Sequence, residues 1–383
     1  MIAPRHNLPL RRLTTFGVAG TAAQAWQLDD IAQLDALLEA IQAYKDPEGG
    51  PSGRPFVLGG GSNVLFARDL PEPLILVRLT GRRLLDDDGS SVLVDIGAGE
   101  PWDETVKFTL AHGWFGLENL SLIPGLMGGA PWQNIGAYGV EVSRFIETVE
   151  AVHLGNGRRR TFSAADCNFG YRSSFFKTPT GRHWLITSVQ LRLSRQAQPF
   201  LGYPEVEQEV AALSALQAAE DGTGDGVGGG ADRRAGGGAS GGASGGSRAA
   251  GPSPEQVAAA VRSLRRRKLP DPAVVGNAGS FFKNPVVSRD QLESLRHACP
   301  TVPWYPLPED ASSAKLSAGW LIEAAGWKGF REGDAGVSSK HALVLVNHGN
   351  ATGAQLLALA RRIQRSVLER FGVALEPEPV IVS

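Results

Sequence analysis

The sequence has few cysteines, no long apolar run and almost no excess charge, and each shortage excludes a class of protein. Its two cysteines, Cys167 and Cys299, lie far apart and form no CxxC pair, which fits a reducing compartment better than a disulfide framework. No stretch approaches the roughly 18 consecutive apolar residues of a membrane span. The formal net charge is -1, so the overall balance indicates neither nucleic acid nor a membrane surface as a partner.

The N-terminal segment, residues 1–15, carries arginines but lacks the apolar core of a signal peptide. We therefore expect a soluble, cytoplasmic protein. We separately expect it to be a monomer that acts on a small molecule. The histidines and cysteines show no metal-ligand spacing, so no metal site is predicted. A chain of 383 residues is too long for one ordinary core, and two or three domains are expected.

Glycine is abundant instead, with 48 residues in all, and it is concentrated in one segment. Residues 221–252 are nearly half glycine and contain no aromatic residue, which predicts a flexible loop. A helix start follows directly, with Ser253 as the N-cap, Pro254 at the first helical position and Gln256 at the third. We expect this helix to reach Lys268.

Elsewhere, short apolar strands alternate with glycine loops and amphipathic segments, and this mixture predicts an α+β fold. The patterns predict strands at 56–58, 74–77, 92–96 and 343–346, a hairpin of 149–154 with 159–162, and helices at 32–44, 102–112 and 354–371. Gly113 and Gly372 follow two of these helices in the position of C-cap glycines.

Two glycine-rich motifs flank the predicted strand pair. The first, Gly59-Gly60-Gly61-Ser62-Asn63, follows a strand and can direct consecutive N–H groups at an anion. Its spacing fits neither GxGxxG nor GxxxxGK[ST], so neither a Rossmann nor a P-loop site is supported. The second extends from Gly116 to Gly139 and suits backbone packed against a flat ligand. Each motif alone could be a set of tight turns, whereas together they could hold the two ends of a dinucleotide.

Further motifs carry charged or hydroxyl side chains. Ser280 follows a glycine and could be a nucleophile, a proton donor or a cap, but the absence of GxSxG and of paired histidines disfavours Ser–His–Asp catalysis. The basic run Arg265–Lys268 is either a solvated helix face or a phosphate site. Arg172 lies among aromatic residues and needs an acidic partner, either a substrate carboxylate or an internal acid. Glu378, between prolines, is by itself typical of an exposed tail.

Taken in order, these motifs resemble the UDP-N-acetylenolpyruvoylglucosamine reductase family. The resemblance begins at Thr14-Thr15-Phe16-Gly17 and includes both glycine motifs, Tyr171-Arg172 and the segment Lys268–Pro272. It continues through Gly279–Pro285 and ends at Leu375–Glu378, so that it covers nearly the whole chain except residues 221–252. Tyr203, in a Leu-Gly-Tyr context, resembles the subgroup whose tyrosine-bearing loop closes over the substrate.

The resemblance implies a two-lobed FAD-binding domain of the flavin-linked oxidase type and a smaller α+β substrate-binding domain. The implied divisions are lobes at 1–67 and 68–212, a flexible insertion at 213–252, the substrate domain at 253–373, and a C-terminal segment at 374–383 that returns to the active site. The implied activity is the NADPH-driven reduction of the enolpyruvyl group of a UDP-sugar to UDP-N-acetylmuramate in peptidoglycan precursor synthesis, with FAD bound non-covalently.

By the same resemblance, Ser280 would be the proton donor, while Arg172 and Glu378 would stabilise the reaction intermediate. The residues implied for FAD binding are Thr15, Gly59, Gly60, Gly61, Ser62, Asn63, Ile123, Pro124, Gly125, Gly128, Gly129, Asn134, Gly136, Ala137, Tyr138 and Gly139. The residues implied for substrate binding are Tyr171, Tyr203, Lys268, Asn284 and Lys328.

The chain departs from this resemblance at Val380, where some members of the subgroup have a basic residue. A charge contact is therefore either missing or supplied elsewhere. Two alternatives remain open: a flavin-linked oxidase with the same FAD domain, and a non-catalytic UDP-sugar sensor. The Ser280 motif and the basic helix argue against the oxidase, and the joint presence of Arg172, Ser280 and Glu378 argues against the sensor.

Overall fold

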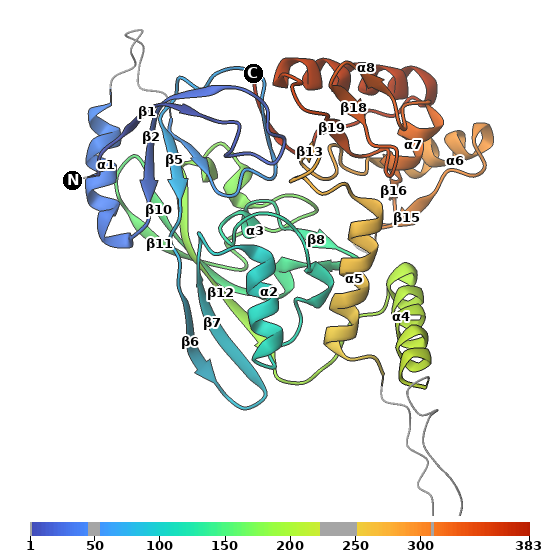
Figure 1. Cartoon of the computed structure of the whole chain (residues 1–383), viewed down its shortest axis with the longest axis horizontal. Helices are drawn as coiled ribbons and strands as arrows, with labels where there is room; N and C mark the ends of the chain where they lie inside the picture. The colour runs from blue at the N-terminus through green and yellow to red at the C-terminus, as the bar shows by residue number, and fades with distance from the viewer. Residues whose placement is uncertain (1, 45–53, 223–250, 308–309) are drawn as a thin grey trace, which may run out of the picture.

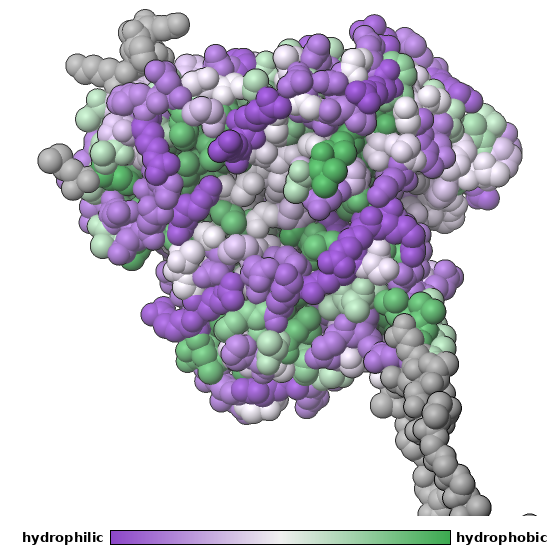
Figure 2. Space-filling view, in the orientation of Figure 1, coloured by the Kyte–Doolittle hydropathy of each residue, from purple (hydrophilic) through white to green (hydrophobic). Residues whose placement is uncertain are grey.

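The computed structural model describes residues 2–44, 54–222, 251–307 and 310–383, with residues 220–222 described by their backbone alone (Figure 1). The α+β fold predicted from the sequence is confirmed. Apolar side chains form three buried clusters, and the face in Figure 2 is largely hydrophilic with small apolar patches. Most of the predicted glycine-rich loop, residues 223–250, lies outside the described residues, so its flexibility stays a prediction.

A four-stranded sheet forms the N-terminal region. Its order is β1–β2–β5–β3, in which β1 and β2 are antiparallel while β5 runs parallel to both β2 and β3. The elements are β1 (Arg5–Pro9), β2 (Thr21–Leu28), η1 (Ile31–Gln33), α1 (Leu34–Ala43), β3 (Phe56–Leu58) and β5 (Leu74–Val77). All four residues of β5 are buried, as fits a strand between two parallel neighbours. β3 leads directly into the glycine loop Gly59–Asn63.

A five-stranded antiparallel sheet forms the second region, in the order β11–β10–β12–β7–β6. Its strands are β6 (Arg82–Asp87), β7 (Ser91–Gly97), β10 (Ile146–His153), β11 (Arg159–Ser163) and β12 (Trp184–Ser194). In β7 and β12 buried residues alternate with less buried ones, because successive side chains point to opposite faces. The buried face packs into the same apolar cluster as α1 and α2.

Short elements connect these strands and carry the second glycine motif. They are α2 (Trp102–Ala111), η2 (Glu118–Leu120), α3 (Gly129–Trp132), β8 (Gly136–Ala137), β9 (Val140–Glu141), η3 (Val142–Arg144), η4 (Phe175–Lys177) and η5 (Gly181–His183). The buried indole of Trp102 on α2 donates to the carbonyl oxygen of Leu120 at 2.9 Å, which ties α2 to η2.

A pair of helices, α4 (Pro204–Gly222) and α5 (Pro254–Lys268), lies side by side at the edge of the molecule around a small apolar cluster (Figure 1). α5 begins with the predicted capping box, in which the Ser253 and Gln256 side chains bond to each other's backbone N–H groups. One boundary needs correction: residues 213–222, assigned to the flexible insertion, are helical. The run Ala-Leu-Ser-Ala-Leu-Gln-Ala-Ala-Glu in this part of α4 consists mostly of strong helix formers, which explains the longer helix.

The C-terminal region combines two small antiparallel sheets with three helices. One sheet has the order β13–β19–β18–β17 and the other β14–β16–β15. The elements are β13 (Gly276–Asn277), β14 (Val286–Ser288), α6 (Arg289–Ala298), β15 (Trp304–Pro306), β16 (Ser313–Leu316), α7 (Ala318–Ala324), β17 (Arg331–Glu332), β18 (Ala335–Val337), β19 (Leu345–Asn347) and α8 (Gly353–Phe371).

The last strand, β20 (Val380–Val382), leaves this region and pairs in parallel with β4 (Val64–Phe66). The N-terminal and C-terminal regions also share one apolar cluster, in which the rings of Phe16 and Phe281 meet edge to face at 6.1 Å. The N-terminal lobe therefore packs on the C-terminal region through a continuous core.

The predicted helices and strands are confirmed with small shifts. β19 begins at Leu345 instead of residue 343, because the Val344 N–H donates to the His341 carbonyl oxygen at 3.1 Å and closes a turn there. Gly372 ends α8 in the left-handed conformation with φ 65° and ψ 18°, as predicted for a C-cap glycine.

Gly353, the first residue of α8, generates a stability prediction. A Cβ at this position would lie 1.8 Å from the carbonyl oxygen of Phe66, so Gly353→Ala should force the helix away from β4. We expect a loss of about 3 kcal/mol in the free energy of unfolding, measured by urea denaturation. Gly372→Asn is the matched control, because nothing lies within 4 Å of its Cβ and asparagine tolerates positive φ. Equal losses for both variants would contradict this account.

Candidate active site

The loop Gly59–Asn63 presents a row of unpaired backbone N–H groups. Within the part of the chain that the structure describes, the N–H groups of residues 60–63 donate to no protein acceptor. Gly61 has a φ of 61°, and a Cβ there would lie 1.9 Å from the carbonyl oxygen of Leu13, so only glycine fits. Successive free N–H groups in such a loop form an anion-binding concavity. The geometry therefore fits a phosphate group.

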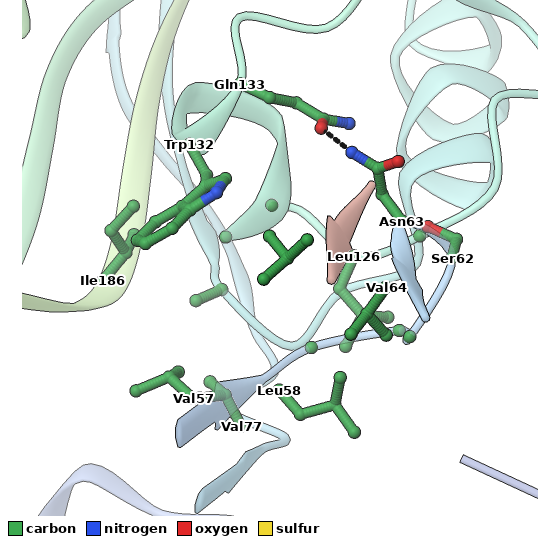
Figure 3. Close-up of a pocket in the computed structure, with 18 of the residues that line it drawn as sticks. Val57, Leu58, Ser62, Asn63, Val64, Val77, Leu126, Trp132, Gln133 and Ile186 are labelled. Carbon is green, nitrogen blue, oxygen red and sulfur yellow. Dashed lines mark hydrogen bonds between the residues drawn. The ribbon is translucent and has the colours of Figure 1, made fainter. Parts of the chain in front are cut away.

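A second loop, residues 124–129, lies against the first. A Cβ on Gly60 would come within 2.9 Å of the Cα of Gly125, and the Ser62 hydroxyl donates to the Pro124 carbonyl oxygen at 3.0 Å. The Asn63 side-chain amide donates to the Gln133 side chain across the same contact (Figure 3). The two glycine motifs, distant in sequence, thus form one wall.

This wall bounds a cavity with an empty volume of about 1260 Å³, which includes space open to solvent. The predicted residues that line it are Gly59, Gly60, Gly61, Ser62, Asn63, Pro124, Gly125, Gly128 and Gly129. Gly129 has no atom within 4 Å of an added Cβ, so it faces open space and leaves room for a ligand. The volume suits a ligand of dinucleotide size.

The rest of the lining is apolar, and the sequence reasoning missed it. Trp132 and Ile186 lie on one side of the cavity in Figure 3, with Val57 and Val77 below and Leu126 at the glycine wall. Trp184 and Ile186 occupy alternate positions of β12, so they belong to one face of that strand. This alternation is visible in the sequence and could have grouped Trp184 with Ile186, but it does not indicate which face of the strand borders a cavity. Two cations, Arg54 and Arg182, also reach the lining.

Several residues predicted for the cofactor do not reach this lining, namely Thr15, Ile123, Asn134, Gly136, Ala137, Tyr138 and Gly139. Asn134 is 1% exposed, and its amide donates to Glu141 at 2.8 Å and to the Gly170 carbonyl oxygen at 3.1 Å while accepting from the Ser143 N–H. Its side chain therefore holds protein turns together. Thr15 lies behind the first loop, where its N–H donates to the Gly61 carbonyl oxygen at 3.1 Å.

Arg172 projects from a tight turn beside the cavity wall. Gly170 and Ser173 exchange backbone hydrogen bonds, and Arg172 between them has a φ of 52°, which non-glycine residues rarely adopt. The guanidinium lies with Nε 2.9 Å from Oε1 of Glu378, and its Nη2 donates to the Gly136 carbonyl oxygen at 2.7 Å. The sequence left two acidic partners open for Arg172, a substrate carboxylate and an internal acid. In the structure the partner is an internal acid, Glu378.

The C-terminal segment brings Glu378 to this point and joins three regions. The Glu378 N–H donates to the Phe281 carbonyl oxygen at 2.8 Å, which places Glu378 next to the segment that carries Ser280. Two residues later, the Val380 N–H donates to the Asn63 carbonyl oxygen at 3.0 Å, and Val380 itself lines the cavity. Glu378 is thus not part of an exposed tail. The structure brings the Arg172–Glu378 ion pair next to the segment that carries Ser280, at the edge of the glycine-lined cavity.

Tyr171 and Asn284 lie close to the same cluster. The ring of Tyr171 lies 4.4 Å from the Lys315 ammonium nitrogen, and burial raises the pKa of its hydroxyl. The Asn284 backbone amide bonds to that hydroxyl, while its side-chain oxygen accepts from the Ala318 N–H at 3.0 Å.

Of the other predicted substrate residues, Tyr203 and Lys268 lie at the helical pair α4–α5, and Lys328 lies in the turn that follows α7. Tyr203 packs edge to face on Tyr138 at 5.4 Å, and burial raises the pKa of Tyr203 to about 12. Lys268 on α5 forms an ion pair with Glu205 on α4. Lys328 lies 2.9 Å from Glu323 and remains partly exposed.

A half-buried cation, Lys177, was missed by the sequence reasoning, although it ends the motif that contains Arg172. Burial, together with the nearby cations Lys283 and Arg172, lowers the pKa of Lys177 to about 8, and Glu378 partly opposes this shift. Among the described residues, no group of histidine, cysteine and acidic side chains could hold a metal ion. A search of the same residues finds no helix with the length and apolar character needed to cross a bilayer.

Comparison with known proteins gives matches over the whole chain. Residues 271–382 match the family model described as UDP-N-acetylenolpyruvoylglucosamine reductase, C-terminal domain, and residues 29–163 match the model described as FAD binding domain. A crystal structure of UDP-N-acetylenolpyruvylglucosamine reductase from Thermus caldophilus superposes with a TM-score of 0.61 at 24% identity. That match covers 100% of this chain and 99% of the other, and it supports the fold.

Relatives with higher sequence identity to this chain have the same description. UDP-N-acetylenolpyruvoylglucosamine reductase of Chromobacterium violaceum is 48% identical, covering 99% of this chain and 98% of its own length. The enzyme of the same description from Burkholderia vietnamiensis is 44% identical, covering 99% and 96%. At this identity over nearly the full length, the chain belongs to the UDP-N-acetylenolpyruvoylglucosamine reductase family.

Proposed function

We propose that this chain carries out the reaction for which its family is named, using NADPH as the reductant. The enolpyruvyl group of UDP-N-acetylglucosamine enolpyruvate is reduced to give UDP-N-acetylmuramate, a precursor of peptidoglycan. The observation that carries the proposal is the meeting of Arg172, Glu378 and the Ser280 segment at the rim of the glycine-lined cavity.

The residues of the cavity fit FAD, which when bound would pass hydride from the reductant to the substrate. The free N–H groups of the Gly59–Asn63 loop would hold its diphosphate, and the open space at Gly129 would admit the cofactor. No histidine or cysteine lies among the described residues of the lining, which supports non-covalent binding. Cys167 is buried, and burial raises its pKa to about 12, so this thiol stays protonated at neutral pH.

Arg172 and Glu378 form the electrostatic part of the site. Reduction of the enolpyruvyl double bond develops negative charge next to the substrate carboxylate, and a fixed guanidinium lowers the energy of that state. Arg172 is oriented before substrate binds, because its Nη2 donates to the Gly136 carbonyl oxygen and the Glu378 carboxylate lies 2.9 Å from its Nε as an ion-pair partner. An already oriented cation needs no rearrangement as the charge appears.

Ser280 supplies the proton that completes the reduction. Its side chain is half-buried, and the next residue is held on both sides: the Phe281 N–H donates to Leu343 at 2.7 Å and its carbonyl oxygen accepts from Glu378. A serine hydroxyl is a weak acid, but an enolate-like carbon is a strong base, so transfer over a short hydrogen bond is feasible.

We also assign the substrate contacts to Tyr171, Tyr203, Lys268, Asn284 and Lys328, and the chain to the subgroup with the tyrosine-bearing loop. Support comes from Tyr203, which precedes α4 directly and packs on Tyr138, and from the Lys268–Glu205 ion pair, which ties this loop to α5. A monomer in the cytoplasm stays a prediction, which sedimentation and cell fractionation can check.

The function is tested by anaerobic visible absorbance of the purified protein. A flavin spectrum should bleach on addition of NADPH and return on addition of the enolpyruvyl UDP-sugar. Recovery with oxygen only would support the oxidase alternative. A protein that stays colourless after incubation with FAD would contradict the cofactor assignment.

Ser280→Ala tests the proton donor. Because the serine acts after hydride has left the flavin, flavin reduction by NADPH should remain near the wild-type rate. Reoxidation by the sugar nucleotide should slow by a factor of about 100 or more in anaerobic stopped-flow measurements. Ser294→Ala, at an exposed position on α6, is the control and should change neither step. Equal slowing of both steps by Ser280→Ala would contradict the role.

Gly129→Leu tests the cavity as the cofactor site. The new side chain would enter the open space beside the glycine wall, so the purified variant should contain less than about a tenth of the wild-type FAD. Its thermal unfolding without cofactor should match that of the wild-type apoprotein, and Gly129→Ala should show a smaller loss of FAD. Full FAD occupancy in Gly129→Leu would place the cofactor elsewhere.

A further inference from the structure

The backbone of Lys177 is held from two sides. Lys177 ends η4, directly after the fully buried Phe176, and its own carbonyl oxygen accepts from Nε of Arg182 at 3.0 Å. Upstream, the Ser174 hydroxyl donates to the Trp132 carbonyl oxygen at 2.7 Å, which connects this turn to the cavity wall. The backbone from which the Lys177 side chain extends is therefore fixed beside this wall.

The ammonium group of Lys177 donates to the carbonyl oxygen of Arg172 itself, at 3.0 Å. Arg172 has the left-handed backbone conformation, which is unfavourable for a non-glycine residue and persists only where neighbouring contacts hold it. Asn134 supports the start of the same turn through Gly170. Lys177 is the side chain that bonds to the strained residue's own carbonyl group, and so controls the direction in which Arg172 projects.

The charges around Lys177 leave an excess of positive charge. Arg172, Arg182 and Lys283 face it, and Glu378 is the acid among the groups that act on it. Glu378 is already paired with Arg172, and Lys283 lies 3.0 Å from Glu376. A site with this balance favours an additional anion, such as the carboxylate of the enolpyruvyl group.

We propose that Lys177 is a positioning residue for the reduction: through its hydrogen bond to the Arg172 carbonyl oxygen it holds the turn from which the Arg172 guanidinium projects. The inference rests on the proposed function, because Arg172 acts on the reaction intermediate only if the chain reduces the enolpyruvyl group. Lys177 loses its proton near pH 8, so its cationic form, and with it the support of Arg172, should decline as the pH rises through that value.

Two substitutions test this proposal, with flavin reduction and reoxidation measured separately. Lys177→Met should slow flavin reoxidation by the enolpyruvyl UDP-sugar at least tenfold at pH 7. The loss should appear mainly in the limiting rate constant at saturating sugar nucleotide, and not in the sugar nucleotide concentration that gives half of this rate. FAD content and reduction by NADPH should stay unchanged. Lys107→Met, an exposed lysine on α2, is the control and should behave as wild type. A Lys177→Met enzyme with wild-type reoxidation would overturn the proposal.

The pH profile covers the case in which Lys177→Met does not fold. In the wild-type enzyme, kcat/KM for the sugar nucleotide should fall as the pH rises through about 8. Lys177→Arg, which stays cationic, should keep part of the activity and lose this alkaline decline. A decline at the same pH in Lys177→Arg would overturn the proposal. If the wild-type protein itself failed to turn over the sugar nucleotide, the proposed function and not Lys177 alone would be in error.

Discussion

The site depends on the backbone pairing of one short segment near the end of the chain. Glu378 pairs with Phe281 of the C-terminal region, and two residues later Val380 pairs with Asn63 of the first glycine loop. Strand β20 then continues beside β4. Because these bonds lie within a few residues of one another, the segment sets the distance between the cavity, the Ser280 turn and the Arg172–Glu378 ion pair. Without this segment, the N-terminal and C-terminal regions would still share an apolar core, but no polar site would be formed by both of them.

The cavity wall requires glycine residues because backbone segments lie in close contact there, as well as because of turn geometry. The loops at 59–63 and 124–129 touch backbone to backbone, so a side chain at Gly60 would collide with Gly125, while one at Gly61 would collide with the carbonyl oxygen of Leu13. Gly129 differs, since a side chain there would enter empty space. The same residue type thus has two physical roles in one wall, contact between loops and room for a ligand.

The polar side of the site brings together several half-buried cations. Arg172, Lys177 and Lys283 lie close to the carboxylates of Glu378 and Glu376, and the lowered pKa of Lys177 reflects the cost of desolvation. We expect this excess of positive charge to favour the binding of an anionic substrate. The strained backbone of Arg172 fits the same pattern, because strain of this kind persists only where neighbouring contacts hold it in place.

The α+β class, the helices and strands predicted above and the glycine motifs could be read from the sequence, because apolar periodicity, capping residues and glycine loops are local signals. The capping box at Ser253 and the left-handed Gly372 are examples. Other facts came from the fold: Asn134 bonds to protein turns, Trp132 and Ile186 line the cavity, and Lys177 bonds to Arg172. Each of these facts depends on which distant segments come into contact, and residue spacing along the chain does not contain that information.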